Sequence, residues 1–330
     1  MTLNIRDRDA LFALGRALEA AHYRFTTITP ASHERINARA GNEQAQDLRG
    51  VFGWSRPFDA GAIDPAIVTL MRRAGVLDES GPLLRSTVRA STLGERCYFH
   101  SAFPTDRADS VFFGPDTYRF VAAIERELRK LAAPPARVVD IGCGAGPGAV
   151  QIARRFPDAA VFAADINPAS LALTAINAGL AGARNVTPVS SDLLNGIDGE
   201  FDLIVSNPPF MMDPGERSYR SGGGLRGADL SVEIVKTAME RLRPGGSLLL
   251  YTGVAISADQ DEFQGAIAPL LDASCQAWTY EELDPDVFGE DLAEPVYFDV
   301  ERIAAVWLHA VKRTRMRKSD FPEQAGKTVQ

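Results

Sequence analysis

The chain has 330 residues, of which 45% are hydrophobic and 24% are charged, with a net charge of −8. This is ordinary for a folded protein, and the length allows two domains that each bury a core. The negative charge disfavours a partner held mainly through its phosphates. No apolar run is long enough to span a bilayer or to act as a signal peptide, so we expect no membrane partner.

The cysteines and histidines show no metal-binding or disulfide pattern. Cys97, Cys143 and Cys275 are scattered and odd in number, which favours a reducing, cytoplasmic location. The four histidines have no ligand spacing, so no metal is expected. Residues 1–110 hold 14 Arg, no Lys and 13 acidic residues, a net charge of +1, and the remainder therefore carries −9.

The N-terminal third is predicted to be mainly helical. Apolar residues at helical spacing predict helices over residues 7–23, 32–40, 43–52 and 65–74. Ser32 and Asp64 are candidate N-caps. Residues 83–100 are rich in β-branched and aromatic residues and predict a hairpin that turns near Gly94. Residues 1–110 are thus either a winged-helix-like domain or a helical cap with a short β annex.

From residue 111 to 315 the pattern alternates regularly between apolar strands and amphipathic helices. Strands are expected at residues 137–141, 160–165, 186–190, 201–206, 247–254, 276–280 and 302–311. Helices are expected at residues 117–131, 149–156, 168–181, 231–242 and 259–271. This alternation predicts an α/β domain with a doubly wound, seven-stranded, mostly parallel sheet, followed by a tail over residues 316–330.

A glycine-rich loop follows the first of these strands. The strand ends at Asp140, and the next residues include Gly142, Cys143, Gly144 and Gly146. Such a turn binds a nucleotide-like cofactor, because glycines allow the backbone to approach the ligand closely. Both NAD and S-adenosylmethionine use loops of this kind. An acid at the strand end and a proline in place of an amide donor at residue 147 suit a pyrophosphate poorly and favour S-adenosyl-L-methionine.

Two further acidic residues end the next two strands. Asp165, followed by Ile166 and Asn167, is placed to bond the ribose hydroxyls. Asp192, between Ser191 and Leu193, is placed to meet the adenine amino group, although a residue of this kind also occurs as a plain turn cap. Cys143 in the loop is read as a small filler and not as a nucleophile.

The run Asn207-Pro208-Pro209-Phe210 follows the fourth strand, and Asn207 is expected to contact the cofactor as well as the methyl acceptor. A planar nitrogen attacks a methyl sulfonium poorly, because its lone pair is delocalised into a π-system. The side-chain carbonyl of Asn207 and the main-chain carbonyl of Pro208 can accept hydrogen bonds from the two N–H groups of this nitrogen. These bonds help the nitrogen to become pyramidal. The prolines stiffen the loop, and the Phe210 ring can stack on the acceptor.

With these motifs, residues 111–311 resemble the class I S-adenosylmethionine-dependent methyltransferases of the small-domain group. That group includes release-factor glutamine N5-, ribosomal RNA guanine-N2- and adenine-N6-methyltransferases, which share the (D/N/S)PP(Y/F) tetrad. Residues 111–118 resemble the segment of the group that packs over the cofactor, which implies that Phe113, Asp116 and Thr117 contact it. Residues 220–227 resemble the glycine-rich segment of the glutamine enzymes, although those enzymes usually carry Tyr where this chain has Phe210.

The methyl acceptor stays open at this stage. The arginine-only N-terminal part and the basic run 312–318 place RNA slightly ahead of a translation-related protein, although that run also reads as a solvated tail. DNA and a small molecule remain possible acceptors. A binding module that has lost catalysis and an NAD-dependent oxidoreductase are the alternatives to a methyltransferase. The acidic residues 284–299 are predicted to form a loop that rims the site.

Overall fold

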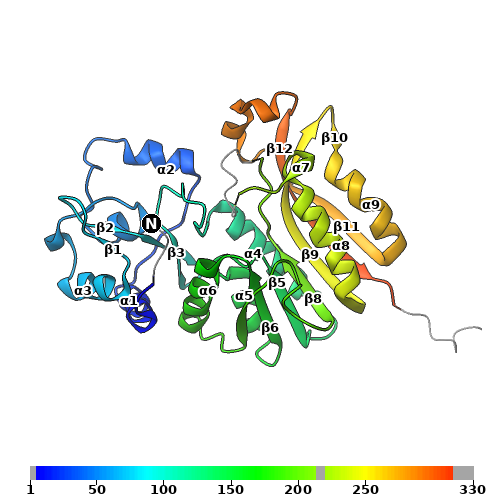
Figure 1. The fold of residues 1–330 in the computed structure, drawn as a ribbon, viewed down its shortest axis with the longest axis horizontal. Coiled ribbons are helices and arrows are strands. Elements are labelled where there is room, and N and C mark those ends of the chain that lie inside the picture. Colours follow the sequence, from blue (N-terminus) through cyan, green and yellow to red (C-terminus); the bar gives the residue numbers. More distant parts are fainter. Residues whose placement is uncertain (1–4, 213–219, 315–330) are drawn as a thin grey trace, which may run out of the picture.

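The computed structural model describes residues 5–212 and 220–314, and it contains one large mixed sheet with helices on both faces (Figure 1). Of the basic run 312–318, residues 315–318 lie outside the described residues, as does the tail predicted over residues 316–330. No helix in the described ranges is long and apolar enough to cross a membrane.

The sheet confirms the predicted architecture. Its strand order is β7-β6-β5-β8-β9-β12-β11, with the short β10 paired to β9. Strands β7 to β9 run parallel, and β12 is antiparallel to both of its neighbours. The bounds are β5 Arg137–Ile141, β6 Ala160–Asp165, β7 Val186–Ser190, β8 Phe201–Ser206, β9 Leu242–Ser257, β10 Gln260–Asp261, β11 Cys275–Asp284 and β12 Arg302–Lys312.

Two hydrophobic layers cover the two faces of the sheet, as expected when its central strands are mostly apolar. One layer packs three helices against the sheet and continues into the N-terminal part, and the other layer packs two. The first three are α4 Pro115–Leu128, α5 Pro147–Arg155 and α6 Pro168–Leu180. The other two are α8 Asp229–Arg241 and α9 Glu262–Ser274, preceded by the short α7 Gly224–Gly227.

The N-terminal part combines helices with two small hairpins and lies beside α6 (Figure 1). Its helices are α1 Arg8–Ala20, α2 Pro30–Asn37 and α3 Pro65–Ala74. Its strands are β1 Leu77–Asp78, β2 Arg85–Ser86, β3 Val88–Leu93 and β4 Arg96–Ser101. Because its buried residues belong to the same hydrophobic cluster as α4 to α6, the predicted boundary near residue 110 does not interrupt the core.

Two local predictions in this part were wrong. Thr29, and not Ser32, caps α2, because Pro30 is favourable at the first helical position and the Thr29 hydroxyl accepts from the Ser32 N–H at 3.3 Å. The helix expected over residues 43–52 is only a single π-turn, Arg49–Gly53. A Cβ on Gly53 would lie 2.2 Å from the Phe25 ring, so tertiary packing against that ring sets the local backbone.

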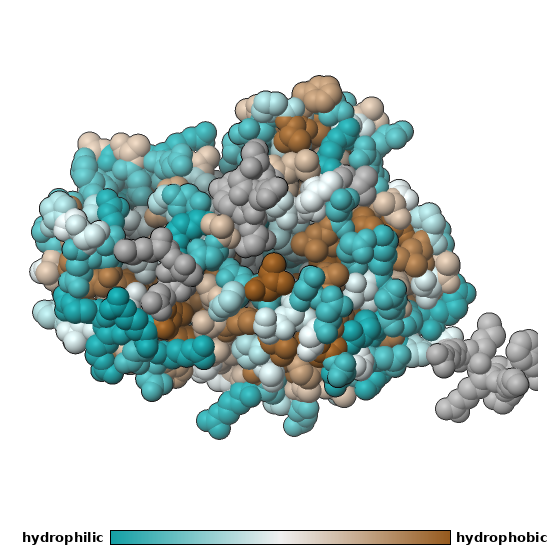
Figure 2. All heavy atoms as spheres, viewed as in Figure 1, coloured by the Kyte–Doolittle hydropathy of each residue, from teal (hydrophilic) through white to brown (hydrophobic). Residues whose placement is uncertain are grey.

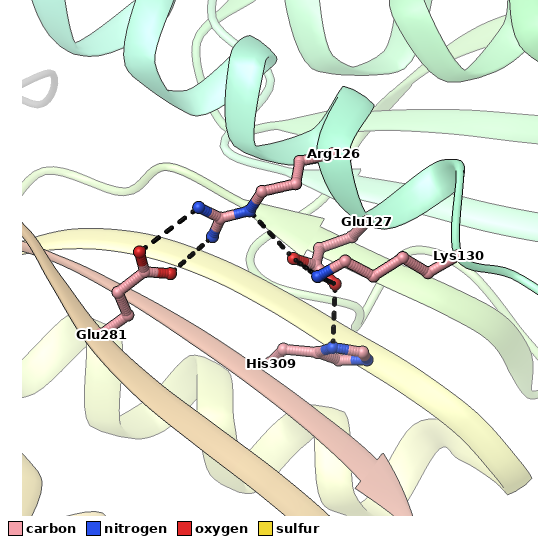
Figure 3. A network of polar contacts seen from close by, with 5 residues as sticks. All are labelled: Arg126, Glu127, Lys130, Glu281 and His309. Carbon is pink, nitrogen blue, oxygen red and sulfur yellow. Dashed lines mark hydrogen bonds and ion pairs between the residues drawn. The ribbon is translucent and has the colours of Figure 1, made fainter.

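A charged network joins α4 to the edge of the sheet (Figure 3). Arg126 forms a bidentate pair with Glu281 of β11, at 2.6 and 3.3 Å. The neighbouring carboxylate of Glu127 is 5% exposed and meets Lys130 at 2.9 Å and His309 of β12 at 3.3 Å. The network ties the C-terminal end of α4 to the sheet, while the N-terminal end of the helix reaches the cavity described next.

Candidate active site

The glycine loop joins β5 to α5 at the carboxyl edge of the parallel strands, where ligands of such sheets bind. Gly142 and Gly144 have φ values of 68° and 54°, which favour glycine, and both line the main cavity. Gly146 corrects our expectation, because it does not line the cavity. A Cβ there would lie 2.8 Å from Thr174 of α6, so Gly146 serves helix packing.

Cys143 lines the cavity but is buried in the loop. Its Sγ lies 3.5 Å from the Thr174 hydroxyl, and burial raises the pKa of the thiol well above its ordinary value. A thiol that stays protonated is not a nucleophile at neutral pH. This geometry agrees with the reading of Cys143 as a small filler.

Asp140 lies under the glycine loop with 1% of its surface exposed. Its Oδ2 accepts from the Ala149 N–H at 2.8 Å, near the start of α5. Burial raises the pKa of Asp140 to about 7, and the nearby Asp165 adds to the rise. Asp140 also lines the cavity, so it can hold a negative charge that a cationic ligand group would stabilise.

Asp165 at the end of β6 organises the opposite side of the loop. Its Oδ2 accepts from the Gly144 N–H at 2.9 Å, and its Oδ1 accepts from the Asn167 N–H at 2.8 Å. The side-chain oxygen of Asn167 caps α6 by accepting a hydrogen bond from the Ala169 N–H at 3.0 Å. Between them Ile166 keeps 60% of its surface exposed, and all three residues line the cavity. An exposed apolar side chain beside a carboxylate suits a ligand with a flat apolar ring and hydroxyl groups.

The turn after β7 supplies the next wall. The Ser191 hydroxyl donates to the Leu193 carbonyl at 2.9 Å and accepts from the Gly196 N–H at 2.9 Å. These bonds hold the turn, while the Asp192 side chain stays exposed. Ser191, Asp192 and Leu193 all line the cavity.

The tetrad begins where β8 ends. The Ser206 hydroxyl donates to the Ile141 carbonyl at 2.7 Å, which ties the ends of β8 and β5 together. Asn207, Pro208, Pro209 and Phe210 all line the cavity, and Asn207 is half-buried. Within the described ranges the Asn207 amide forms no hydrogen bond in this structure, so it can pair with a ligand.

The glycine-rich segment 220–227 packs directly behind the tetrad. Met211 N–H donates to the Arg220 carbonyl, and Gly222 N–H donates to the Met211 carbonyl, both at 2.9 Å. A Cβ on Gly227 would lie 2.1 Å from the Phe210 carbonyl oxygen. The glycines therefore let two backbone segments touch, and that contact fixes the direction of the tetrad loop.

Gly253 in the middle of β9 is a residue of the site that the sequence reading missed. A Cβ there would lie 2.3 Å from two atoms of the Phe210 ring, which the ring of Phe288 contacts on another side at a centroid distance of 5.7 Å. A glycine inside an apolar strand was the available signal, because it marks a close approach.

Gly253→Ala is expected to displace the Phe210 ring. We expect a loss of about 1–3 kcal/mol in stability from overpacking, together with a loss of turnover of at least about tenfold. Calorimetric unfolding and steady-state kinetics measure the two effects. Gly265→Ala in α9 is the matched control, since a Cβ there meets nothing within 4 Å. Equal behaviour of the two variants would contradict the packing role of Gly253.

The segment before α4 closes the cavity from the N-terminal side. Asp116 and Thr117 line it as expected, and Asp116 is held by the Tyr251 hydroxyl at 2.5 Å. Phe113 corrects our expectation, since its ring is 1% exposed and stacks on His100 at 5.1 Å. The preceding residues Ser110, Val111 and Phe112 line the cavity instead.

The acidic segment between β11 and β12, residues 285–301 and hereafter the rim segment, reaches the tetrad. It includes the short helices Gly289–Ala293 and Pro295–Tyr297. Phe288 lines the cavity, and the Tyr297 hydroxyl accepts from the Met212 N–H at 2.7 Å. Arg220 pairs with Asp291, and Arg226 pairs with Asp299 at 2.6 Å. The predicted rim loop is thus confirmed in position, and it is tied to the glycine-rich segment.

The cavity therefore brings together every residue that the motifs singled out, apart from Phe113 and Gly146. Leu230 and Ile234 of α8 and Phe288 of the rim segment complete it, and no local sequence pattern marked Phe288 or the supporting Tyr251. No group of three or more His, Cys, Asp or Glu residues in the described part of the chain could hold a metal ion.

Comparisons with known proteins agree with this geometry. The methyltransferase small domain family matches residues 125–260. The release factor glutamine methyltransferase of Cereibacter sphaeroides is 31% identical over 283 residues, which cover 79% of this chain and 94% of that protein. The enzyme of the same name from Deinococcus radiodurans is 34% identical over 191 residues, or 54% of this chain and 63% of that protein.

A third relative acts on a different protein. The ribosomal protein uL3 glutamine methyltransferase of Neisseria meningitidis is 32% identical over 126 residues, which cover 35% of this chain and 42% of that protein. The aligned region covers nearly all of the Cereibacter enzyme. The alignments to the other two relatives cover about two thirds and two fifths of those proteins. The chain belongs to the release factor glutamine methyltransferase family of class I methyltransferases.

Proposed function

We propose that this protein transfers a methyl group from S-adenosyl-L-methionine to the side-chain amide nitrogen of a glutamine in a protein of the translation apparatus. The observation that carries the proposal is the Asn207 amide, which lies in one cavity with the strand-end acids Asp140, Asp165 and Asp192. The names of the relatives support the acceptor class, because each of them methylates glutamine in a release factor or a ribosomal protein.

The residues of the cavity fit the cofactor. Asp165 would accept from the ribose hydroxyls, and Asp192 would meet the adenine amino group. The exposed Ile166 and the side chain of Leu193 offer apolar surface to the adenine ring. Asp140 would lie on the side of the cationic amino acid portion. When bound, the cofactor supplies an electrophilic methyl group on a sulfonium.

The tetrad would prepare the acceptor nitrogen. The Asn207 carbonyl oxygen and the Pro208 main-chain carbonyl would each accept a hydrogen bond from one N–H group of the glutamine amide. These bonds favour a pyramidal nitrogen and stabilise the positive charge that grows on it. Phe210, held by Gly253 and Phe288, gives this part of the cavity a fixed apolar wall. The departure from Tyr to Phe at this position removes a hydroxyl and keeps the ring.

The charge of the rim segment favours a protein acceptor over RNA. Residues 285–301 contain six acidic residues and no Lys, Arg or His. Asp286, Glu290 and Glu294 are exposed, and in Figure 2 the rim segment stands at the top of the molecule with hydrophilic and hydrophobic residues mixed. A polyanion would be repelled from the mouth of the cavity. This observation and the relatives move our proposal from RNA to a protein glutamine.

Labelled transfer tests the acceptor class. Cell extract from a deletion strain is incubated with the enzyme and cofactor carrying a labelled methyl group, then split and treated with nuclease or with protease. We expect the label to be lost only after protease treatment. Asn207→Ala enzyme serves as the control for label that is bound but not transferred. Label that nuclease removes would overturn the protein acceptor while leaving the methyltransferase activity intact.

The pKa of Asp140 predicts how cofactor binding depends on pH. Because burial raises this pKa to about 7, the carboxyl is largely protonated in the free protein at pH 6 and ionised at pH 8. A ligand with an α-ammonium group favours the ionised form. Binding of S-adenosylhomocysteine should therefore strengthen from pH 6 to 8 and release a proton near pH 7.

Calorimetry in two buffers of different ionisation enthalpy measures that proton. In Asp140→Asn the proton release should vanish, and the pH dependence of affinity over this range should flatten. The same raised pKa means that ionising Asp140 costs stability in the ligand-free protein, so its stability should fall as pH rises from about 4 to 7. Unchanged proton release in Asp140→Asn would assign the titration to another group.

A further inference from the structure

A second, smaller cavity lies in the N-terminal part, between the β3–β4 hairpin and the segment that leads to α4. Residues that line it include Thr27, Arg89, His100, Phe103, Thr105 and Phe112. It is partly enclosed and has room for roughly one molecule of the size of water. None of the methyl-transfer chemistry described above uses it.

The guanidinium of Arg89 lies in the wall of this cavity with 4% of the residue exposed. Its Nε donates to the Gly53 carbonyl at 3.0 Å, and its Nη2 lies 3.4 Å from His33 Nδ1. The guanidinium also sits over the Phe25 ring, 5.5 Å from its centroid. Among the described residues no carboxylate forms an ion pair with Arg89, so residues 5–212 and 220–314 supply this buried cation with no counter-charge.

The groups that face Arg89 do not compensate it. Burial lowers the pKa of His33 to about 4 and the pKa of His100 well below its ordinary value, so both rings are neutral at pH 7. Tyr23 and Tyr118 also face it, and burial raises the pKa of both hydroxyls. Burial lowers the pKa of Arg89 to about 10, which leaves it protonated. An unpaired buried charge is costly, and a counter-ion removes that cost.

His100 adds an unsatisfied polar atom to the same wall. Its Nε2 lies 2.7 Å from the Ser91 hydroxyl, whereas its buried Nδ1 has no hydrogen-bond partner in the described part of the chain. The Nδ1 becomes a donor in the tautomer whose Nε2 accepts from Ser91. A fully buried polar atom without a partner is rare, and a ligand in the cavity can satisfy it.

We propose that this cavity binds a small monovalent anion, with the Arg89 guanidinium as its principal partner and His100 as its second. The cavity has room for about one water-sized particle, which restricts the anion to a single atom such as chloride and excludes formate, sulfate and phosphate, which have three to five heavy atoms. Phe112 lines both this cavity and the cofactor cavity, so the anion would sit behind a wall of the active site.

Chlorine NMR tests the proposal on the full chain. The line width of chloride is measured against protein concentration at constant ionic strength, with gluconate as the replacing ion. We expect a saturable excess width that bromide competes away and that formate and sulfate do not. The excess should be lost in Arg89→Met and kept in Arg96→Met, which removes a half-buried arginine from the same hairpin outside the cavity. Equal widths in wild type and Arg89→Met would overturn the site.

A second measurement uses only the wild-type protein, so its result does not depend on whether the Arg89→Met variant folds. Crystals of the wild-type protein are soaked in bromide, whose anomalous signal distinguishes it from water. We expect an anomalous peak within hydrogen-bond distance of the Arg89 guanidinium. Ordered water there, without an anomalous peak, would contradict anion binding and leave Arg89 as a structural residue.

Discussion

Asn207→Ala is expected to lower turnover by about 10²–10³-fold and to leave cofactor affinity nearly unchanged. The Asn207 side chain lies at the end of β8 in the cavity and spends no hydrogen bond on the described residues of the chain. Its loss would remove an acceptor that matters most in the transition state, when the amide N–H bonds become more acidic. Steady-state kinetics and calorimetry with S-adenosylhomocysteine measure the two quantities.

Asn207→Asp separates the role of the acceptor oxygen from that of the side-chain shape. The aspartate keeps an oxygen at the same distance from the backbone, so it should retain more activity than the alanine variant. Full activity in Asn207→Ala would show that nitrogen activation does not depend on this residue. A parallel loss of cofactor binding would instead place Asn207 in the cofactor site.

Asp165→Ala is expected to weaken cofactor binding by about 1–3 kcal/mol, the cost of leaving buried hydrogen-bonding groups without their charged acceptor. In the free protein its two oxygens already hold the N–H groups of Gly144 and Asn167. The variant therefore loses both the ribose partner and part of the loop order. Calorimetry at fixed pH measures the change in dissociation constant.

Asp165→Asn is the matched control for that experiment. Its remaining carbonyl oxygen can still accept from one of the two N–H groups, but it carries no charge. An affinity between those of wild type and Asp165→Ala is expected. Wild-type affinity in Asp165→Ala would contradict the assignment of this residue to the cofactor.

Much of the sheet was predictable because its central strands β5, β8 and β9 are mostly apolar and buried. The bounds expected for residues 160–165, 186–190 and 201–206 agree with β6, β7 and β8. The N-terminal part was harder, because tertiary contacts decide its backbone. The residues of the expected helix 43–52 instead turn around Gly50 and Gly53, where Asp47 accepts from the Gly50 N–H at 2.7 Å.

The acids of the site were predictable for a topological reason. Asp140 and Asp165 lie at the ends of β5 and β6, and Asp192 lies just after β7; the carboxyl ends of such neighbouring parallel strands meet at one edge. Phe113 was misplaced because the resemblance located the segment but not which of its residues face the cavity. Phe288 and Gly253 were missed because their contact with Phe210 joins segments that are distant in sequence.

The central claim is that a glutamine side-chain nitrogen of a protein receives the methyl group. The most direct test is tandem mass spectrometry of a purified release factor, from the organism that supplies this chain, after incubation with the enzyme and S-adenosylmethionine. We predict one added methyl group on a glutamine side chain, absent with Asn207→Ala enzyme. An unmodified release factor together with methylated RNA, or a methyl group on an oxygen or a carbon atom, would contradict the account.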